Sequence, residues 1–260
     1  MTFKSPEEIV EAVGVSAFKK TAFNYKKLFL LSVLAGSYIA FGGLLAIKVG
    51  GGVPEIQANN PGVASLLFGA VFPVGLILVV LAGAELFTGN TAIVIPALRS
   101  KRISFRDVLK NWFVSYIGNM MGSLLVAYFF VYLTGILNNA PWNLFVINLA
   151  SAKISQTYLT LILKAIACNW LVCLAVWLAF SSNQVSGKIL GIWFPIMTFV
   201  ALGFEHSVAN MFFIPLGIFL GDQVTWSQFF INNLIPVTLG NMIGGILFVG
   251  FVYSYIYLRK

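Results

Sequence analysis

The chain has few charged residues. Asp, Glu, Lys and Arg make up only 9% of its 260 residues, whereas 59% are hydrophobic. A water-soluble domain needs more polar surface than this to cover its core, because charged residues form about a quarter of an average soluble chain. The composition therefore excludes an ordinary soluble fold and predicts a protein of the lipid bilayer.

Residues that carry enzyme or metal chemistry are also scarce. The chain has one histidine and two cysteines, and it contains no G-x-S-x-G or H-E-x-x-H motif. Cys168 and Cys173 are separated by about 140° around one predicted helix, so neither a disulfide nor a metal pair is expected. We predict no enzyme activity, no metal and no cofactor.

Long apolar runs are what the sequence has in abundance. A membrane helix needs about 20 predominantly apolar residues. Runs at or above this length cover residues 28–48, 63–98, 110–137, 158–180, 189–220 and 228–257. We predict an all-α membrane protein in which residues 28–260 form one domain with six transmembrane helices.

Basic residues are distributed unequally among the segments between these runs. Thirteen, including Arg259 and Lys260 in the tail, lie on the side that holds both termini, and only Lys48 and Lys153 lie on the other. Under the positive-inside rule, this bias predicts a multi-pass protein of the cell (inner) membrane with both termini in the cytoplasm. Topology thus explains the net charge of +8, and no nucleic-acid partner is expected.

Residues 1–27 form a separate N-terminal segment. Its acidic residues and its lack of a continuous apolar core argue against a cleavable signal peptide. The string Ser5-Pro6-Glu7-Glu8 is typical of a helix start, and one side of the following helix would carry Ile9, Val10, Val13, Ala17 and Phe18. We predict an amphipathic helix on the inner membrane surface. A short cytoplasmic packing helix is the alternative.

Two passages with the frame G-x-E-x-x-x-x-N, residues 83–90 and 203–210, interrupt the second and fifth apolar runs. A second pair of strings, G-N-M-M-G at 118–122 and G-N-M-I-G at 240–244, repeats at nearly the same offset. Each half has three spans, so the second half enters the membrane from the opposite side. We predict two inverted three-helix repeats with broken second and fifth helices. The glycines of the second pair would let helices approach closely.

The interrupted helices contain ionisable groups near the middle of the membrane. An ionised carboxylate there costs at least about 2.5 to 3.5 kcal/mol, so Glu85 and Glu205 should each have a partner. We expect both carboxylates, with Asn90 and Asn210, to bind backbone amides that the breaks leave free. They would support the site without contacting the substrate.

His206 is the only histidine and lies in the second break, and Thr88 lies in the corresponding part of the first. We predict that the imidazole and the hydroxyl face each other across a pore, where they hold a small anion or give it a proton. A satisfied core histidine is the alternative. Lys153 and Lys164 would attract anions to the outer entrance, unless Lys164 extends to the lipid headgroups.

Four strings resemble motifs of the formate/nitrite transporter family: A-E-L-F-T-G at 84–89, A-C-N-W-L-V-C-L-A at 167–175, G-F-E-H-S-V-A-N-M at 203–211 and N-L-I-P-V-T-L-G-N at 233–241. The resemblance to this family extends through all six spans. The resemblance implies an aquaporin-like fold, a homopentamer with one pore in each protomer, and passage of formate, nitrite or hydrosulfide, with formate as the first choice. It also implies residue roles: a pore centre at His206 and Thr88, a vestibule lysine at Lys153, a tuning asparagine at Asn169, and constrictions at Phe72, Leu76, Leu86, Phe87, Val172, Phe199 and Asn233.

A transport mechanism follows from these expectations. A bare anion in an apolar constriction costs several kcal/mol, so formate would take a proton near His206 and Thr88 and cross as the neutral acid. A direct anion leak beside a protonated histidine is the competing mechanism, and the sequence leaves channel and proton-coupled carrier open. An aquaporin would need paired Asn-Pro-Ala strings, and the similar string at 60–62 has no partner.

Overall fold

The structure is a computed structural model that describes residues 3–258, and most of this range is helical. Arg259 and Lys260, which the orientation argument includes, lie outside the described residues. In chain order the helices are α1 (Pro6–Thr21), α2 (Tyr25–Gly50), α3 (Pro54–Asn59), α4 (Pro61–Val71), α5 (Val74–Ala82), α6 (Phe87–Arg99), α7 (Phe105–Leu125), the π-helix η1 (Val126–Tyr132), α8 (Trp142–Ile154), α9 (Tyr158–Ser181), α10 (Val185–Ala201), α11 (Ser207–Phe219), α12 (Trp226–Gln228), the π-helix η2 (Phe229–Leu234), α13 (Ile235–Gly245), the π-helix η3 (Ile246–Phe251) and α14 (Val252–Tyr257).

Within residues 3–258, five helical stretches are long and apolar enough to cross a membrane. They are Tyr25–Gly50, Pro61–Ala82, Phe105–Tyr132, Tyr158–Ser181 and Trp226–Tyr257. The fifth apolar run of the sequence is divided between two shorter apolar helices, α10 and α11. The second run is also divided, because residues 83–86 separate α5 from α6. The chain is therefore a multi-pass membrane protein.

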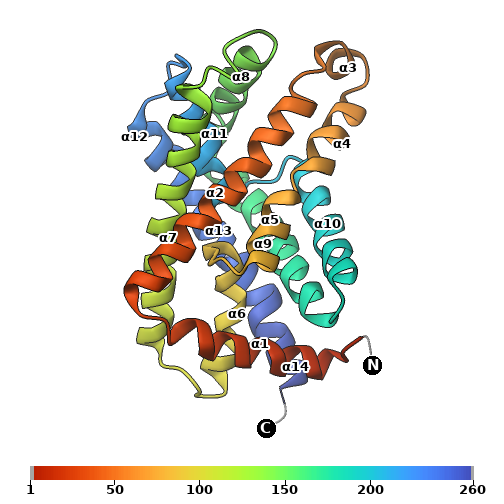
Figure 1. Cartoon of the computed structure of the whole chain (residues 1–260), viewed down its shortest axis with the longest axis vertical. Coiled ribbons are helices and arrows are strands. Elements are labelled where there is room, and N and C mark those ends of the chain that lie inside the picture. Colours follow the sequence, from red (N-terminus) through yellow and green to blue (C-terminus); the bar gives the residue numbers. More distant parts are fainter. Residues whose placement is uncertain (1–2, 259–260) are drawn as a thin grey trace.

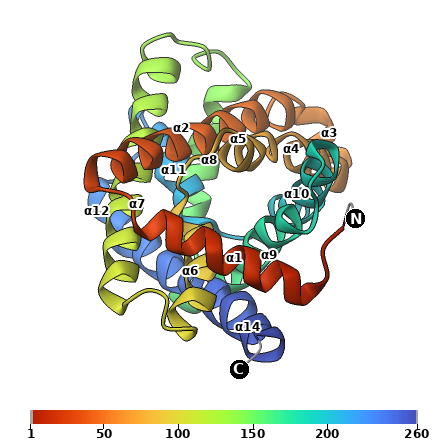
Figure 2. The same cartoon turned by 60° about the horizontal axis from the view of Figure 1, so that its bottom comes forward.

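Helix α1 lies across the end of the bundle that also carries α14 (Figures 1 and 2). It begins with a capping box, in which the Ser5 backbone donates to Glu8 Oε2 at 2.7 Å and the Glu8 backbone donates to Ser5 Oγ at 3.3 Å. Its buried side chains pack mainly on α6 and include Ile9, Val10, Val13 and Ala17. Phe18 is 54% exposed. The protein therefore covers most of the apolar side of α1 but leaves Phe18 exposed.

Two helix pairs make similar close contacts. Helix α7 packs on α2, and α13 packs on α9. A Cβ added to Gly122 of α7 would lie 2.8 Å from the backbone nitrogen of Ser37, and one added to Gly244 of α13 would lie 3.1 Å from that of Trp170. These glycines allow the backbones to approach closely, as predicted.

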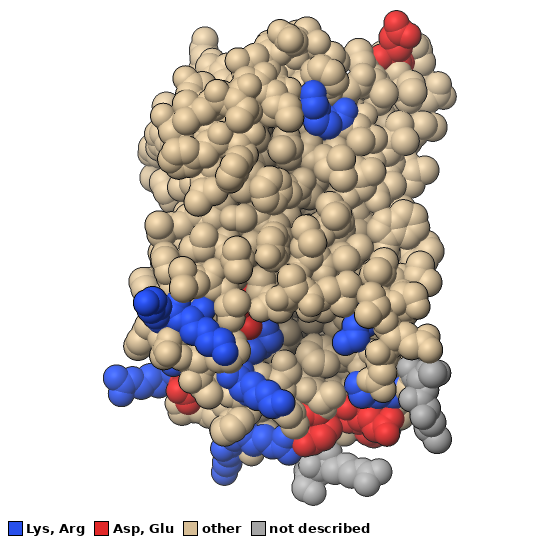
Figure 3. Space-filling model, viewed as in Figure 1, with Lys and Arg blue, Asp and Glu red and all other residues tan. Residues whose placement is uncertain are grey.

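Charge is concentrated at one end of the molecule. In the view of Figure 3, most Lys and Arg side chains gather around the end that carries α1 and α14. The opposite end carries α3 and α8 (Figure 1). Two links lie between these ends: residues 83–86 join α5 to α6, and residues 202–206 join α10 to α11. Glu85 and Glu205 in these links are each only 2% exposed.

Candidate functional site

The chain turns at a glycine between α5 and α6 and again between α10 and α11. Gly83 ends α5 with φ +83°, and Gly203 follows α10 with φ +68°. Both values lie in the left-handed region, where a side chain is strained. After each glycine the chain is extended for a few residues and then starts a half-helix, α6 at Phe87 and α11 at Ser207. The helix starts point into the interior, where their backbone amides need partners.

Asn119 of α7 binds the first link. Its Oδ1 accepts the Phe87 N–H at 2.8 Å, and its Nδ2 donates to the carbonyls of Ser32 at 2.8 Å and Glu85 at 2.9 Å. The side chain is fully buried. One amide therefore holds the start of α6 and joins it to α2.

Asn241 of α13 binds the second link in the same way. Its Oδ1 accepts the Ser207 N–H at 2.8 Å, and its Nδ2 donates to the carbonyls of Ala165 at 2.8 Å and Glu205 at 3.0 Å. These two asparagines stand at the second position of the repeated G-N-M-x-G strings. That repeat could have identified them, because glycines alone explain a close helix contact and leave the asparagine unexplained.

The expectation that Glu85 and Glu205 bind the freed amides is therefore wrong. Glu85 accepts from Lys20 Nζ of α1 at 2.5 Å and from Asn90 Nδ2 at 2.9 Å. The side-chain nitrogen of Asn90 therefore binds the Glu85 carboxylate, and the expectation that Asn90 binds a freed backbone amide is not met by this hydrogen bond. A carboxylate accepts hydrogen bonds most strongly from a cation, so the lysine satisfies the buried charge.

Glu205 has an equivalent set of partners. Lys153 Nζ of α8 lies 3.0 Å from both carboxylate oxygens, Asn210 Nδ2 donates at 2.6 Å, and Gln156 Nε2 donates at 3.3 Å. Lys153 is only 9% exposed. The predicted vestibule cation is thus neutralised by a buried carboxylate, and the pair has no net charge with which to attract anions.

His206 and Thr88 meet as predicted. His206 Nε2 lies 2.8 Å from Thr88 Oγ1, and both residues are buried. His206 Nδ1 accepts the backbone N–H of Ala209 at 3.1 Å, so the histidine also caps α11. Because Nδ1 uses its lone pair in this bond, the neutral ring carries its proton on Nε2 and donates it to Thr88. The Thr88 hydroxyl then keeps its own proton for another acceptor.

The position of Thr88 is fixed through its carbonyl oxygen. This oxygen accepts from Thr91 Oγ1 at 2.7 Å, from Asn169 Nδ2 at 3.1 Å and from Cys173 Sγ at 3.4 Å. Asn169 Nδ2 also lies 2.6 Å from the carbonyl of Asn241. Asn169 therefore connects the start of α6 to Asn241, the residue that binds the second link, which is a positioning role.

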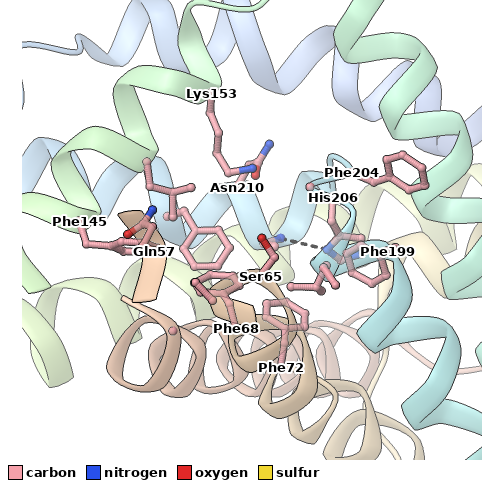
Figure 4. Close-up of a pocket in the computed structure, with 18 of the residues that line it drawn as sticks. Gln57, Ser65, Phe68, Phe72, Phe145, Lys153, Phe199, Phe204, His206 and Asn210 are labelled. Carbon is pink, nitrogen blue, oxygen red and sulfur yellow. Dashed lines mark hydrogen bonds between the residues drawn. The ribbon is translucent and has the colours of Figure 1, made fainter. Parts of the chain in front are cut away.

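Two cavities approach the His206–Thr88 pair from opposite ends. The Lys153 vestibule, about 240 Å³, is lined by residues that include Lys153, Asn210, Phe199 and His206 (Figure 4). The Lys20 vestibule, about 350 Å³, is lined by residues of α1, α5, α6, α9 and α10, including Lys20 and Glu85. Between them is a constriction of only about 10 Å³.

The constriction is almost entirely apolar. Its lining consists of Ile39, Phe72, Leu76, Leu86, Val172, Ile196, Phe199 and His206. Phe72 and Phe199 meet edge to face with ring centroids 6.0 Å apart. The structure thus brings five of the predicted constriction residues together beside His206. It adds Ile39 and Ile196, which no motif of the sequence marked.

Three predicted site residues lie elsewhere. Phe87 packs edge to face on Tyr116 at 4.9 Å. Asn233 accepts from Asn210 Nδ2 at 2.8 Å and donates to the Lys153 carbonyl at 3.0 Å, so it supports the Glu205 cluster. Lys164 is partly exposed on α9, and the described residues that line the three cavities do not include it.

Comparison with known proteins assigns the chain to a family. Residues 7–255 match the family described as formate/nitrite transporter. A protein named "Probable formate transporter" from Methanothermobacter thermautotrophicus is 51% identical over 274 residues, which cover 100% of this chain and 99% of that protein. The chain therefore belongs to the formate/nitrite transporter family.

Solved structures agree with this assignment. One, described as "FNT family ion channel", superposes with a TM-score of 0.87 at 32% identity and covers 97% of this chain and 99% of its own. Another, described as "Pentameric formate channel with formate bound", has a TM-score of 0.81 at 35% identity, with 90% of this chain and 98% of its own covered. The fold is thus that of a channel family.

Proposed function

We propose that the chain carries formate, or a similarly small monovalent anion of a weak acid, through a pore in each protomer. The observation that carries the proposal is the apolar constriction of about 10 Å³ that joins two vestibules beside His206. A space of this size admits roughly one water-sized group. The names of the relatives, which include a probable formate transporter and a channel with formate bound, support formate as the substrate.

We further propose that the architecture follows the repeats of the sequence. Residues 28–260 would cross the membrane six times as two inverted three-helix repeats with an aquaporin-like arrangement, and α5–α6 and α10–α11 would be the broken second and fifth crossings. Asn119 and Asn241, which we call the two latches because each binds one link, support this arrangement. They occupy equivalent positions in the two G-N-M-x-G strings. The chain would form a homopentamer, because a solved structure similar to it is described as a pentameric channel.

The proposed orientation places α1 and both termini in the cytoplasm of the cell. The gathering of Lys and Arg at the end that carries α1 supports this orientation (Figure 3). Residues 1–27 would then form a cytoplasmic segment whose helix is attached to the bundle. The Lys153 vestibule would open to the outside and the Lys20 vestibule to the cytoplasm.

The substrate would cross the constriction as the neutral acid. A charged carboxylate there would lose its water and meet apolar side chains, at a cost of several kcal/mol or more. A neutral acid of the same size avoids most of this cost. Transport would therefore move one proton with each formate and no net charge.

His206 and Thr88 would bind the substrate without relaying its proton. A relay needs Nδ1 to take up a proton when Nε2 gives one away, but Nδ1 faces the N–H of Ala209. In this geometry the imidazole instead orients the Thr88 hydroxyl, whose proton can bind a substrate oxygen. The proton of the acid would come from water in a vestibule. This assignment revises the central relay that the sequence suggests.

The remaining roles divide between lining and support. The constriction would be formed by Phe72, Leu76, Leu86, Val172 and Phe199, with Ile39 and Ile196. The buried clusters Lys20–Glu85–Asn90 and Lys153–Glu205–Asn210 would hold the two links in place, with Asn233 in the second cluster.

Reconstitution tests this function directly. Proteoliposomes loaded with a pH-sensitive dye should acidify when an inward formate gradient is imposed, and the formate taken up should match the protons that enter. Nitrite and hydrosulfide measured in the same vesicles rank the substrates. Formate uptake that carries an equivalent electrical current would show that the anion crosses, and no uptake of any of the three would contradict the function.

A further inference from the structure

The two vestibules differ in charge. The charged groups that line the Lys20 vestibule are Lys19, Lys20, Lys188 and Glu85. Lys20 is paired with Glu85 at 2.5 Å. Among residues 3–258, the one charged side chain that lines the Lys153 vestibule is Lys153 itself, and it is paired with Glu205. After pairing, the first cavity keeps two positive charges and the second keeps none.

Lys19 and Lys188 keep their charge uncompensated. Among residues 3–258, the ion pairs join Lys20 with Glu85, Arg102 with Glu11 and Lys153 with Glu205, and neither Lys19 nor Lys188 takes part in one. Lys19 comes from α1 and Lys188 from α10, so the two lysines line the cavity from separate elements. Positive charge from two sides of a partly enclosed, apolar-walled space strengthens the local potential.

A third cation lies at the same mouth. Lys4 Nζ donates to the carbonyl of Phe180 and to Asn183 Oδ1, each at 3.1 Å, and Phe180 lines the Lys20 vestibule. Both acceptors are neutral, so the charge of Lys4 is not cancelled by these bonds. It adds to the potential of Lys19 and Lys188.

We propose that the Lys20 vestibule is an anion-collecting chamber for small carboxylates and other small oxyanions, with Lys19 and Lys188 as its binding cations. The pore would then be asymmetric: it takes up anions at lower concentration from the α1 end than from the α3 and α8 end. This reverses the sequence expectation, which placed the attracting charge beside Lys153 and Lys164. The expected asymmetry of transport rests on the proposed function, whereas the positive potential in the Lys20 vestibule does not depend on it.

The potential can be measured without transport. Ser16 lines the Lys20 vestibule and Ser65 lines the Lys153 vestibule, and neither is buried. The native cysteines, Cys168 and Cys173, are buried. In Ser16→Cys and Ser65→Cys, the ratio of the reaction rates with an anionic and a cationic methanethiosulfonate reports the potential at each site.

We expect the ratio at Ser16→Cys to exceed that at Ser65→Cys by about fivefold or more in low salt, and to fall as salt approaches 1 M. Adding Lys19→Gln and Lys188→Gln should lower the ratio at Ser16→Cys toward the value at Ser65→Cys. The matched control is Lys26→Gln with Arg106→Gln, which removes the same charge from exposed positions outside the cavity. Equal rate ratios at the two sites would contradict the proposal that the Lys20 vestibule collects anions. So would a rate ratio at Ser16→Cys that stays the same after Lys19→Gln and Lys188→Gln.

A second measurement tests the transport consequence. In right-side-out and inverted membrane vesicles, formate presented to the Lys20 vestibule should reach half-saturation at a several-fold lower concentration than formate presented to the other end. The Lys26 and Arg106 control should preserve this difference, and the Lys19 and Lys188 changes should remove it. Equal half-saturation at both ends with normal flux overturns the asymmetry. Absence of any formate flux contradicts the proposed function instead. In that case the methanethiosulfonate rate ratios alone test whether the Lys20 vestibule collects anions.

Discussion

His206 shows how one residue can serve two elements. Its Nδ1 caps α11 at the Ala209 N–H, and its Nε2 reaches Thr88 at the start of α6. The histidine therefore fixes the distance between the two half-helices at the point where the pore is narrowest. The sequence predicted the meeting with Thr88 because both residues lie in matched interruptions. It could not predict the cap, which depends on the direction of the ring.

Replacement of the histidine separates binding from proton relay. In His206→Asn, the amide oxygen can still accept the Ala209 N–H at the position of Nδ1, but the side chain ends one bond short of the position from which Nε2 reaches Thr88. We expect formate uptake by proteoliposomes to fall by about tenfold or less, since loss of a working proton donor costs about 100-fold or more. Uptake should still rise as external pH falls and still carry protons.

The contrary result is equally definite. A flattened pH dependence, together with an electrical current that accompanies formate uptake, would show that the imidazole passes the proton. His206→Phe serves as the comparison that removes both hydrogen bonds. It should lower the stability of the assembled protein as well as the flux.

The two latches should contribute strongly to stability. Asn241→Ala removes the acceptor of the Ser207 N–H and the side-chain donor to the carbonyls of Ala165 and Glu205. We expect a loss of about 2 kcal/mol or more, which corresponds to a fall of about 4 °C or more in the melting temperature in detergent. Asn139→Ala, at an exposed position, is the control. A melting temperature equal to that of the control would mean that the link is held by other contacts.

At the scale of helices, the sequence predicted where the elements are but not how their charges pair. Five of the six predicted apolar runs contain a helical stretch long enough to cross a membrane, and the matched G-x-E-x-x-x-x-N strings marked the positions where α5–α6 and α10–α11 separate. The cationic partners of Glu85 and Glu205, Lys20 and Lys153, come from α1 and α8, which are remote in sequence. No local pattern carries that information, because the pairing depends on how α1 and α8 pack against the bundle.

The close contact between α7 and α2 gives a test at this scale. A Cβ at Gly122 would lie 2.8 Å from the Ser37 nitrogen, whereas one at Gly62 would meet nothing within 4 Å. We expect Gly122→Ala to lower stability in detergent by about 1 to 3 kcal/mol through overpacking, and Gly62→Ala to change it little. Equal stability of the two variants, measured by thermal unfolding, would show that α7 can shift without loss.

At the scale of the whole molecule, orientation can be tested with one thiol at each end. Glu55 on α3 and Arg106 near the start of α7 are both exposed and lie at opposite ends of the bundle. In intact cells, an impermeant maleimide should label Glu55→Cys and leave Arg106→Cys unlabelled until the membrane is opened. Labelling in the reverse order would place α1 outside the cell and contradict the proposed topology.

The narrow constriction has a consequence for the energy supply of the membrane that contains it. A space of about 10 Å³ holds roughly one water molecule, and its lining is apolar except for His206. Proton hopping needs a continuous chain of hydrogen-bonded water, which this stretch interrupts. Under the proposed mechanism, protons would cross only when bound to a substrate molecule, and a membrane rich in these pores would keep its pH gradient and its voltage whenever formate is scarce.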